Sequence, residues 1–130
     1  MAKKIIDLIY PELCYQIVGI LFEVYNQLGN GYEEKIYQKA IAEALKQSML
    51  KFREQVYLRI DFKGKKVGKC YLDFLIEEKV VLEIKKGNHF STVHIKQVYK
   101  YLVNNDFKLG ILAYFAPRGV HYKRIVNVRN

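Results

Sequence analysis

Two carboxylates and a lysine stand on segments that read as neighbouring strands. Asp73 falls in an apolar segment ending at Ile76, and Glu83 and Lys85 interrupt the apolar run that begins at Val80. Because strand side chains alternate, Glu83 and Lys85 point to the same face. Carboxylate oxygens are ligands that Mg²⁺ and Mn²⁺ prefer, and a nearby ammonium can orient an attacking water or neutralise charge on a phosphate. These residues therefore indicate metal-assisted phosphate chemistry.

The turn between the two strands decides whether the carboxylates meet. A three-residue loop over residues 77–79 pairs Ile76 with Val80. This register then places Asp73 opposite Glu83, with Cβ atoms ~5 Å apart, where two negative charges are unfavourable unless a cation lies between them. A loop one residue longer or shorter would shift the register and separate them. A surface ion-pair network is the alternative, but unpaired charge on a buried strand is costly.

The elements that must position these residues follow from hydrophobic periodicity. The predicted helices cover residues 11–28, 36–45 and 92–105, and the predicted strands cover residues 52–62, 67–76, 80–85, 109–115 and 120–128. The strand carrying Glu83 is apolar at most positions, as expected of a strand buried on both faces. The order is typical of an α/β (α+β) fold, and residues 1–130 are expected to form one domain.

The composition is that of an ordinary globular protein, with 51% hydrophobic and 27% charged residues. No apolar run approaches the ~18 residues of a transmembrane helix. Asp7 interrupts the first segment too early for the core of a signal peptide, so a cytoplasmic protein that does not bind membranes is expected. Cys14 and Cys70 lack the spacing of a zinc site and are expected to be core thiols.

Positive charge is concentrated in one half of the chain. The 22 Lys and Arg residues exceed the 13 Asp and Glu residues, giving a net charge of +9. Residues 1–60 contribute +1 of this charge and residues 61–130 contribute +8. A polyanionic partner such as nucleic acid accounts for this distribution, although lysines that only solvate a small domain are the alternative.

Three short motifs together resemble a known group of nucleases. Asp73, followed by Glu83-Ile84-Lys85 on the next strand, resembles the D…(D/E)-x-K signature of the PD-(D/E)XK nuclease superfamily. Residues 31–37, Gly-Tyr-Glu-Glu-Lys-Ile-Tyr, resemble the pattern of the small GxxExxY protein family. Residues 97–101, Gln-Val-Tyr-Lys-Tyr, resemble the QxxxY element of RecB-type nucleases. The resemblance extends from about Leu13 to Val126.

The resemblance implies an αβββαβ core with a mixed sheet flanked by helices and an extra N-terminal helix. It implies that Asp73, Glu83 and the Ile84 carbonyl bind Mg²⁺ or Mn²⁺, with Lys85 as the catalytic lysine. It also implies that Glu34 reaches the same ion from its helix, directly or through water. A carboxylate placed there only by the helix dipole is the alternative.

Further residues are expected to contact the substrate. The resemblance implies that Gln97 and Tyr101 line the site, and Lys86 is an additional candidate. His94 precedes Gln97 by one helical turn, so it could face the same cleft; contact with phosphate or an ordinary helix position is expected in preference to a role as general base. His89 is expected to be a solvated turn residue.

The function expected from these residues is a metal-dependent nuclease that hydrolyses phosphodiester bonds with metal-activated water. DNA is expected rather than RNA on superfamily grounds alone. A junction or flap resolvase is the runner-up in this class, because a homodimer would place two sites symmetrically. From a different class, the chain could be a noncatalytic module that keeps the nuclease fold and binds nucleic acid or a partner.

Overall fold

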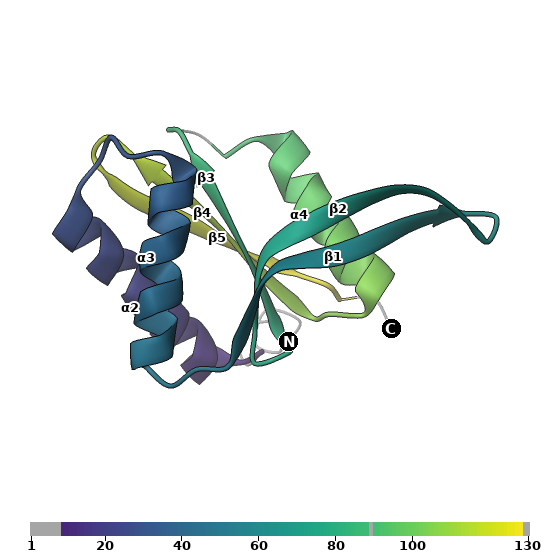
Figure 1. The fold of residues 1–130 in the computed structure, drawn as a ribbon, viewed down its shortest axis with the longest axis horizontal. Coiled ribbons are helices and arrows are strands. Elements are labelled where there is room, and N and C mark those ends of the chain that lie inside the picture. Colours follow the sequence, from purple (N-terminus) through teal and green to yellow (C-terminus); the bar gives the residue numbers. More distant parts are fainter. Residues whose placement is uncertain (1–8, 89, 129–130) are drawn as a thin grey trace.

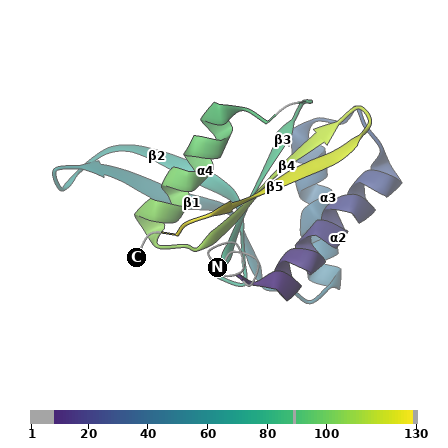
Figure 2. The same cartoon turned by 180° about the vertical axis from the view of Figure 1, so that it is seen from behind.

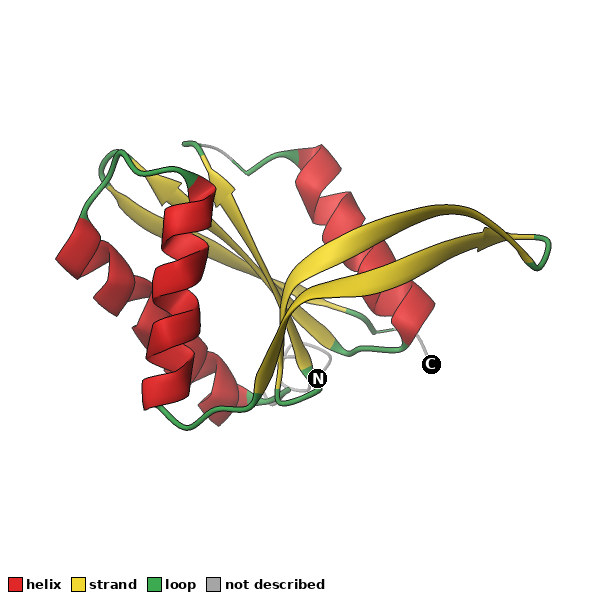
Figure 3. Cartoon of the chain, in the orientation of Figure 1, coloured by secondary structure: helices red, strands yellow, loops and turns green. Residues whose placement is uncertain are grey.

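A mixed five-stranded sheet with helices on both faces makes up the computed structural model, which describes residues 9–88 and 90–128 (Figures 1 and 3). In chain order the described elements are α2 (Pro11–Leu28), α3 (Glu34–Gln47), β1 (Phe52–Phe62), β2 (Lys65–Ile76), β3 (Val80–Lys86), α4 (Thr92–Asn105), β4 (Leu109–Ala116) and β5 (Gly119–Val126). This order confirms the predicted one. Within these residues, no helix is long and apolar enough to cross a membrane.

Local signals fix most element boundaries. Pro11 occupies the first turn of α2, and the Ser91 hydroxyl accepts a hydrogen bond from the Val93 N–H at the start of α4. The strand β2 begins two residues earlier than predicted. Lys63 and Gly64 both have positive φ, so these two residues alone make the hairpin turn.

The strands lie in the order β1-β2-β3-β4-β5. Only β3 and β4 are parallel, and α4 forms the crossover between them, while the other neighbours are antiparallel. Ile76 pairs with Val80 across a three-residue turn, which confirms the predicted register. The first five residues of β3 are buried, as expected for a strand covered on both faces.

Two hydrophobic clusters hold the layers together. One cluster joins α2 and α3 to one face of the sheet, and the other joins α4 to the opposite face (Figures 1 and 2). Gly110 on β4 permits the close approach of α4, because a Cβ atom there would lie 2.7 Å from Val98 Cγ1. Cys14 is in the core, as predicted, but Cys70 is only half-buried because it lies on the projecting part of β2.

The β1–β2 hairpin projects beyond the rest of the sheet (Figure 1), and β2 separates from β3 after Phe74, toward Asp73 and the hairpin tip. The last backbone pair between β2 and β3 is Phe74 with Leu82, whereas β1 and β2 remain paired to the hairpin tip. Leu72 and Phe74 would share a face in a regular strand, yet they pack in opposite clusters. The strand therefore changes face at Asp73.

Candidate active site

Asp73 and Glu83 meet at the fork where β2 separates from β3. The Asp73 N–H donates a hydrogen bond of 3.0 Å to Glu83 Oε2, and the Ile84 N–H donates one of 2.8 Å to Asp73 Oδ2. Each carboxylate thus binds a backbone N–H of the opposite strand, at the place where regular pairing ends. These bonds hold both side chains and bring together two of the four predicted metal ligands, Asp73 and Glu83.

Burial makes the Glu83 carboxylate chemically unusual. The Glu83 residue is only 4% exposed. Burial, followed by the negative charge of Asp73, raises the pKa of Glu83 to about 9, and the positive charge of Lys85 opposes this shift. A surface ion-pair network is therefore the wrong interpretation for Glu83. The raised pKa means that Glu83 tends to keep its proton, which avoids repulsion between two negative carboxylates. A cation bound between Asp73 and Glu83 would relieve the same repulsion.

The donor set fits a hard divalent cation with an open coordination shell. Among residues 9–88 and 90–128, no three His, Cys, Asp or Glu side chains converge into a ready metal cage. Mg²⁺ does not require such a cage, since it commonly binds one or two carboxylates and keeps several waters. Asp73 and Glu83 supply oxygen donors of that kind from two fixed strands.

Glu34 lies at the end of β3, where it binds a backbone N–H outside the Asp73–Glu83 fork. Its Oε2 atom accepts a hydrogen bond of 3.0 Å from the Lys86 N–H. The Tyr37 hydroxyl, one turn along α3, donates to the Gly29 carbonyl oxygen over 2.6 Å and so fixes the start of this helix. The fork carboxylates and Glu34 thus border the same end of β3. The predicted role of Glu34 at a metal, directly or through water, stays a prediction.

Lys85 on β3 is close enough to Glu83 to act on its charge, and His94 on α4 is affected by the charges of Lys85 and Glu34. Lys85 is half-buried, and strand alternation places it on the same face as Glu83. Burial, followed by the positive charge of Lys85, lowers the pKa of His94, while the charge of Glu34 raises it. The lowered pKa favours the neutral form of the His94 ring, which suits contact with a neighbouring hydroxyl better than storage of a positive charge.

Tyr114 is a site residue that the sequence did not indicate. Its hydroxyl oxygen accepts a hydrogen bond from the Ser91 N–H at 3.2 Å and also contacts His94 Nδ1. Since the Ser91 N–H donates, the hydroxyl proton of Tyr114 is available for Nδ1. Tyr114 lies beside Lys85 in the parallel β3–β4 pairing. No short motif announces this neighbour, because it depends on how the crossover aligns two strands.

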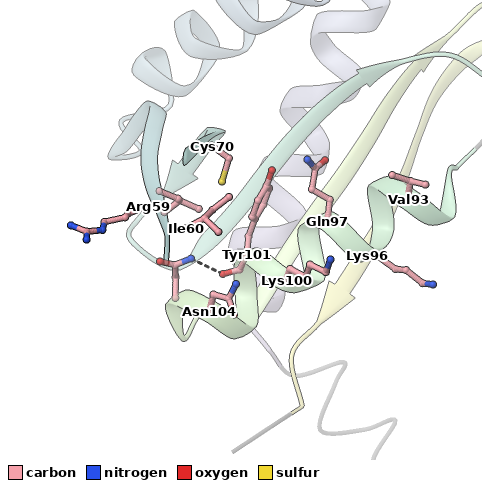
Figure 4. A pocket seen from close by; sticks show the side chains of 11 residues that line it. Arg59, Ile60, Cys70, Val93, Lys96, Gln97, Lys100, Tyr101 and Asn104 are labelled. Carbon is pink, nitrogen blue, oxygen red and sulfur yellow. Dashed lines mark hydrogen bonds between the residues drawn. The ribbon is translucent and has the colours of Figure 1, made fainter. Parts of the chain in front are cut away.

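Gln97 and Tyr101 line a cavity of about 500 Å³ between α4 and the β1–β2 hairpin (Figure 4). Burial, followed by the charge of Glu83, raises the pKa of Tyr101, so its hydroxyl lies within electrostatic reach of the fork. Gln97 and Tyr101 of the predicted QxxxY element thus line the cavity, and Tyr101 is also affected by the charge of Glu83. Lys86 is exposed on the strand face opposite Lys85, and His89 lies outside the described residues.

Comparisons with known proteins agree with this architecture. A model of the PD-(D/E)XK nuclease superfamily matches residues 11–125. The crystal structure of SSO0001 is similar in fold, with a TM-score of 0.57 and 23% identity; the match covers 74% of this chain and 50% of that chain. No curated protein matches the chain. Membership of the narrower GxxExxY family stays a prediction, but the match over most of the sequence shows that the chain belongs to the PD-(D/E)XK nuclease superfamily.

Proposed function

We propose that the protein is a Mg²⁺- or Mn²⁺-dependent nuclease that hydrolyses phosphodiester bonds, with DNA as its substrate. The observation that carries the proposal is the contact between the buried Glu83 and the half-buried Asp73 at the fork of β2 and β3. Superfamily membership supports nuclease-like chemistry at this pair. When bound, the metal would supply a Lewis acid and a water of lowered pKa.

Residues of the chain itself would bind the metal, orient the attacking water and contact the substrate. The carboxylates of Asp73 and Glu83 would hold the ion together with the Ile84 carbonyl, and Glu34 would act through water. The Lys85 ammonium would orient the attacking water or stabilise the charge that grows on the phosphate oxygens. The Tyr101 hydroxyl and the His94 ring, held by Tyr114, would contact the substrate as hydrogen-bonding groups.

Cleavage assays test the proposal. The purified protein would be incubated with supercoiled, linear, single-stranded and branched DNA and with RNA, in Mg²⁺, Mn²⁺ or EDTA. We expect metal-dependent cleavage, and we expect Glu83→Gln and Lys85→Ala each to reduce the rate about 100-fold or more. Lys46→Ala, at the exposed end of α3, is the control variant. Cleavage that persists in both site variants would show that the activity comes from elsewhere.

The assay also separates the alternatives. Preference for branched DNA together with a dimer in solution would favour a junction or flap resolvase. If the folded protein cuts nothing, calorimetry with Mg²⁺ and Mn²⁺ decides the next step. Absence of metal binding would contradict the proposal and favour a noncatalytic binding module.

A further inference from the structure

The cavity beside Tyr101 has walls from two elements that are far apart in the sequence. Ile60 and Cys70 come from the projecting hairpin, and Val93, Gln97 and Tyr101 come from α4 (Figure 4). Its volume of about 500 Å³ lies within the range of pockets that enclose small organic groups, about 300–1,000 Å³. The hairpin creates this space by leaving the sheet at Asp73, so that no strand fills the gap next to α4.

The chemistry of the walls suits a polyanion with apolar faces. Ile60 is 44% exposed and Val93 is 71% exposed, and both line this cavity, so apolar surface from the hairpin and from α4 is gathered at one place. The charged residues lining this cavity are Arg59, Lys96 and Lys100, and no carboxylate lines it. Asp61 pairs with the Arg59 guanidinium at 2.5 Å, so the two lysines on α4 supply most of the local positive charge.

An unpaired strand of nucleic acid matches both features. Single-stranded binding sites combine basic residues that follow the phosphates with apolar or aromatic surface for the bases. A duplex hides its base faces in the stack and would leave Ile60 and Val93 uncovered. Cys70, which lines the cavity, precedes Asp73 by three residues on β2, and Tyr101 on the opposite wall is affected by the charge of Glu83. A strand held in the cavity would therefore lie next to the carboxylates.

We propose that the groove between the β1–β2 hairpin and α4 binds a single-stranded segment of nucleic acid and leads it to the carboxylates. The bases contact the apolar walls, and Lys96 and Lys100 bind the phosphates. This inference rests on the proposed nuclease function, for which it names the substrate class.

Binding without cleavage tests the groove separately from catalysis. Fluorescence anisotropy in EDTA would compare a labelled single strand with a blunt duplex of the same sequence. We expect the single strand to bind at least about tenfold more tightly, and Lys96→Glu with Lys100→Glu to lose about tenfold or more of that affinity. The matched control is Lys39→Glu with Lys46→Glu, which makes the same charge change on α3, across the sheet. Equal binding of the duplex, or an equal loss in the control, would overturn the proposal.

A thiol footprint locates the strand independently of the charge variants. In a Cys14→Ala background, alkylation of the half-buried Cys70 would be timed with and without a saturating single strand. We expect the bound strand to slow the reaction several-fold; an unchanged rate would place the strand elsewhere.

The groove and the nuclease function can fail separately. Specific single-strand binding with no cleavage of any substrate would support the groove and contradict the nuclease function. If the Lys96→Glu, Lys100→Glu double variant keeps metal-dependent cleavage unchanged, the nuclease function stands and the groove proposal is wrong.

Discussion

Glu83 couples the stability of the protein to pH. Burial and Asp73 raise its pKa to about 9 from an ordinary value of 4.5. Between these values the folded state keeps a proton that the unfolded state releases, so the unfolding free energy of the metal-free protein falls as pH rises. Each pH unit costs at most about 1.4 kcal/mol for one proton. Urea unfolding in EDTA at pH 6 and pH 8.5 measures this decrease, and Glu83→Gln should remove most of it. A decrease that remains unchanged in Glu83→Gln would contradict the assignment.

At the scale of single residues, the sequence predicted contacts that depend on local geometry. The contact between Asp73 and Glu83 could be predicted because a three-residue turn fixes the register of the two consecutive strands that carry them. The contact between His94 and Tyr114 could not be predicted, because it joins a helix to a strand through a parallel crossover. Hydrophobic periodicity identifies helices and strands, but it does not show which residues of a helix will lie against which residues of a strand.

The contact between α4 and β4 depends on the absence of a side chain at Gly110. A Cβ atom there would lie 2.7 Å from Val98 Cγ1, which is too close without a shift of the helix. We expect Gly110→Ala to lower the unfolding free energy by about 1–3 kcal/mol. Gly19→Ala is the matched control, because its exposed helical position has no atom within 4 Å, and it should stabilise the protein by about 0.5–1 kcal/mol. Equal effects of the two substitutions in urea unfolding would exclude close packing as the cause.

At the scale of elements, the helices were more predictable than the path of the hairpin. The bounds of α2 and α4 agree with the periodicity, since each has an amphipathic face against the sheet. The alternation in residues 52–62 predicted an ordinary strand of the sheet, yet most of β1 is exposed. The hairpin turns away from the sheet at Gln55 on β1 and Asp73 on β2. Gln55 has a φ of 47°, and the pairing between β1 and β2 is interrupted at these two residues. A single positive φ of this kind has no sequence signature.

The charge distribution of the whole chain leads to a prediction about salt. Residues 61–130 carry +8 of the net charge of +9, and this half includes the hairpin tip and α4. Each phosphate contact with a single strand contributes about −0.7 to the slope of log K against log salt concentration. Removal of the Lys96 and Lys100 contacts should therefore make the slope less steep by about 1.4. Lys39→Glu with Lys46→Glu changes the net charge equally, so anisotropy titrations from low to high salt separate local contacts from overall charge. If both double variants change the slope equally, the basic half acts through its total charge and not through the groove.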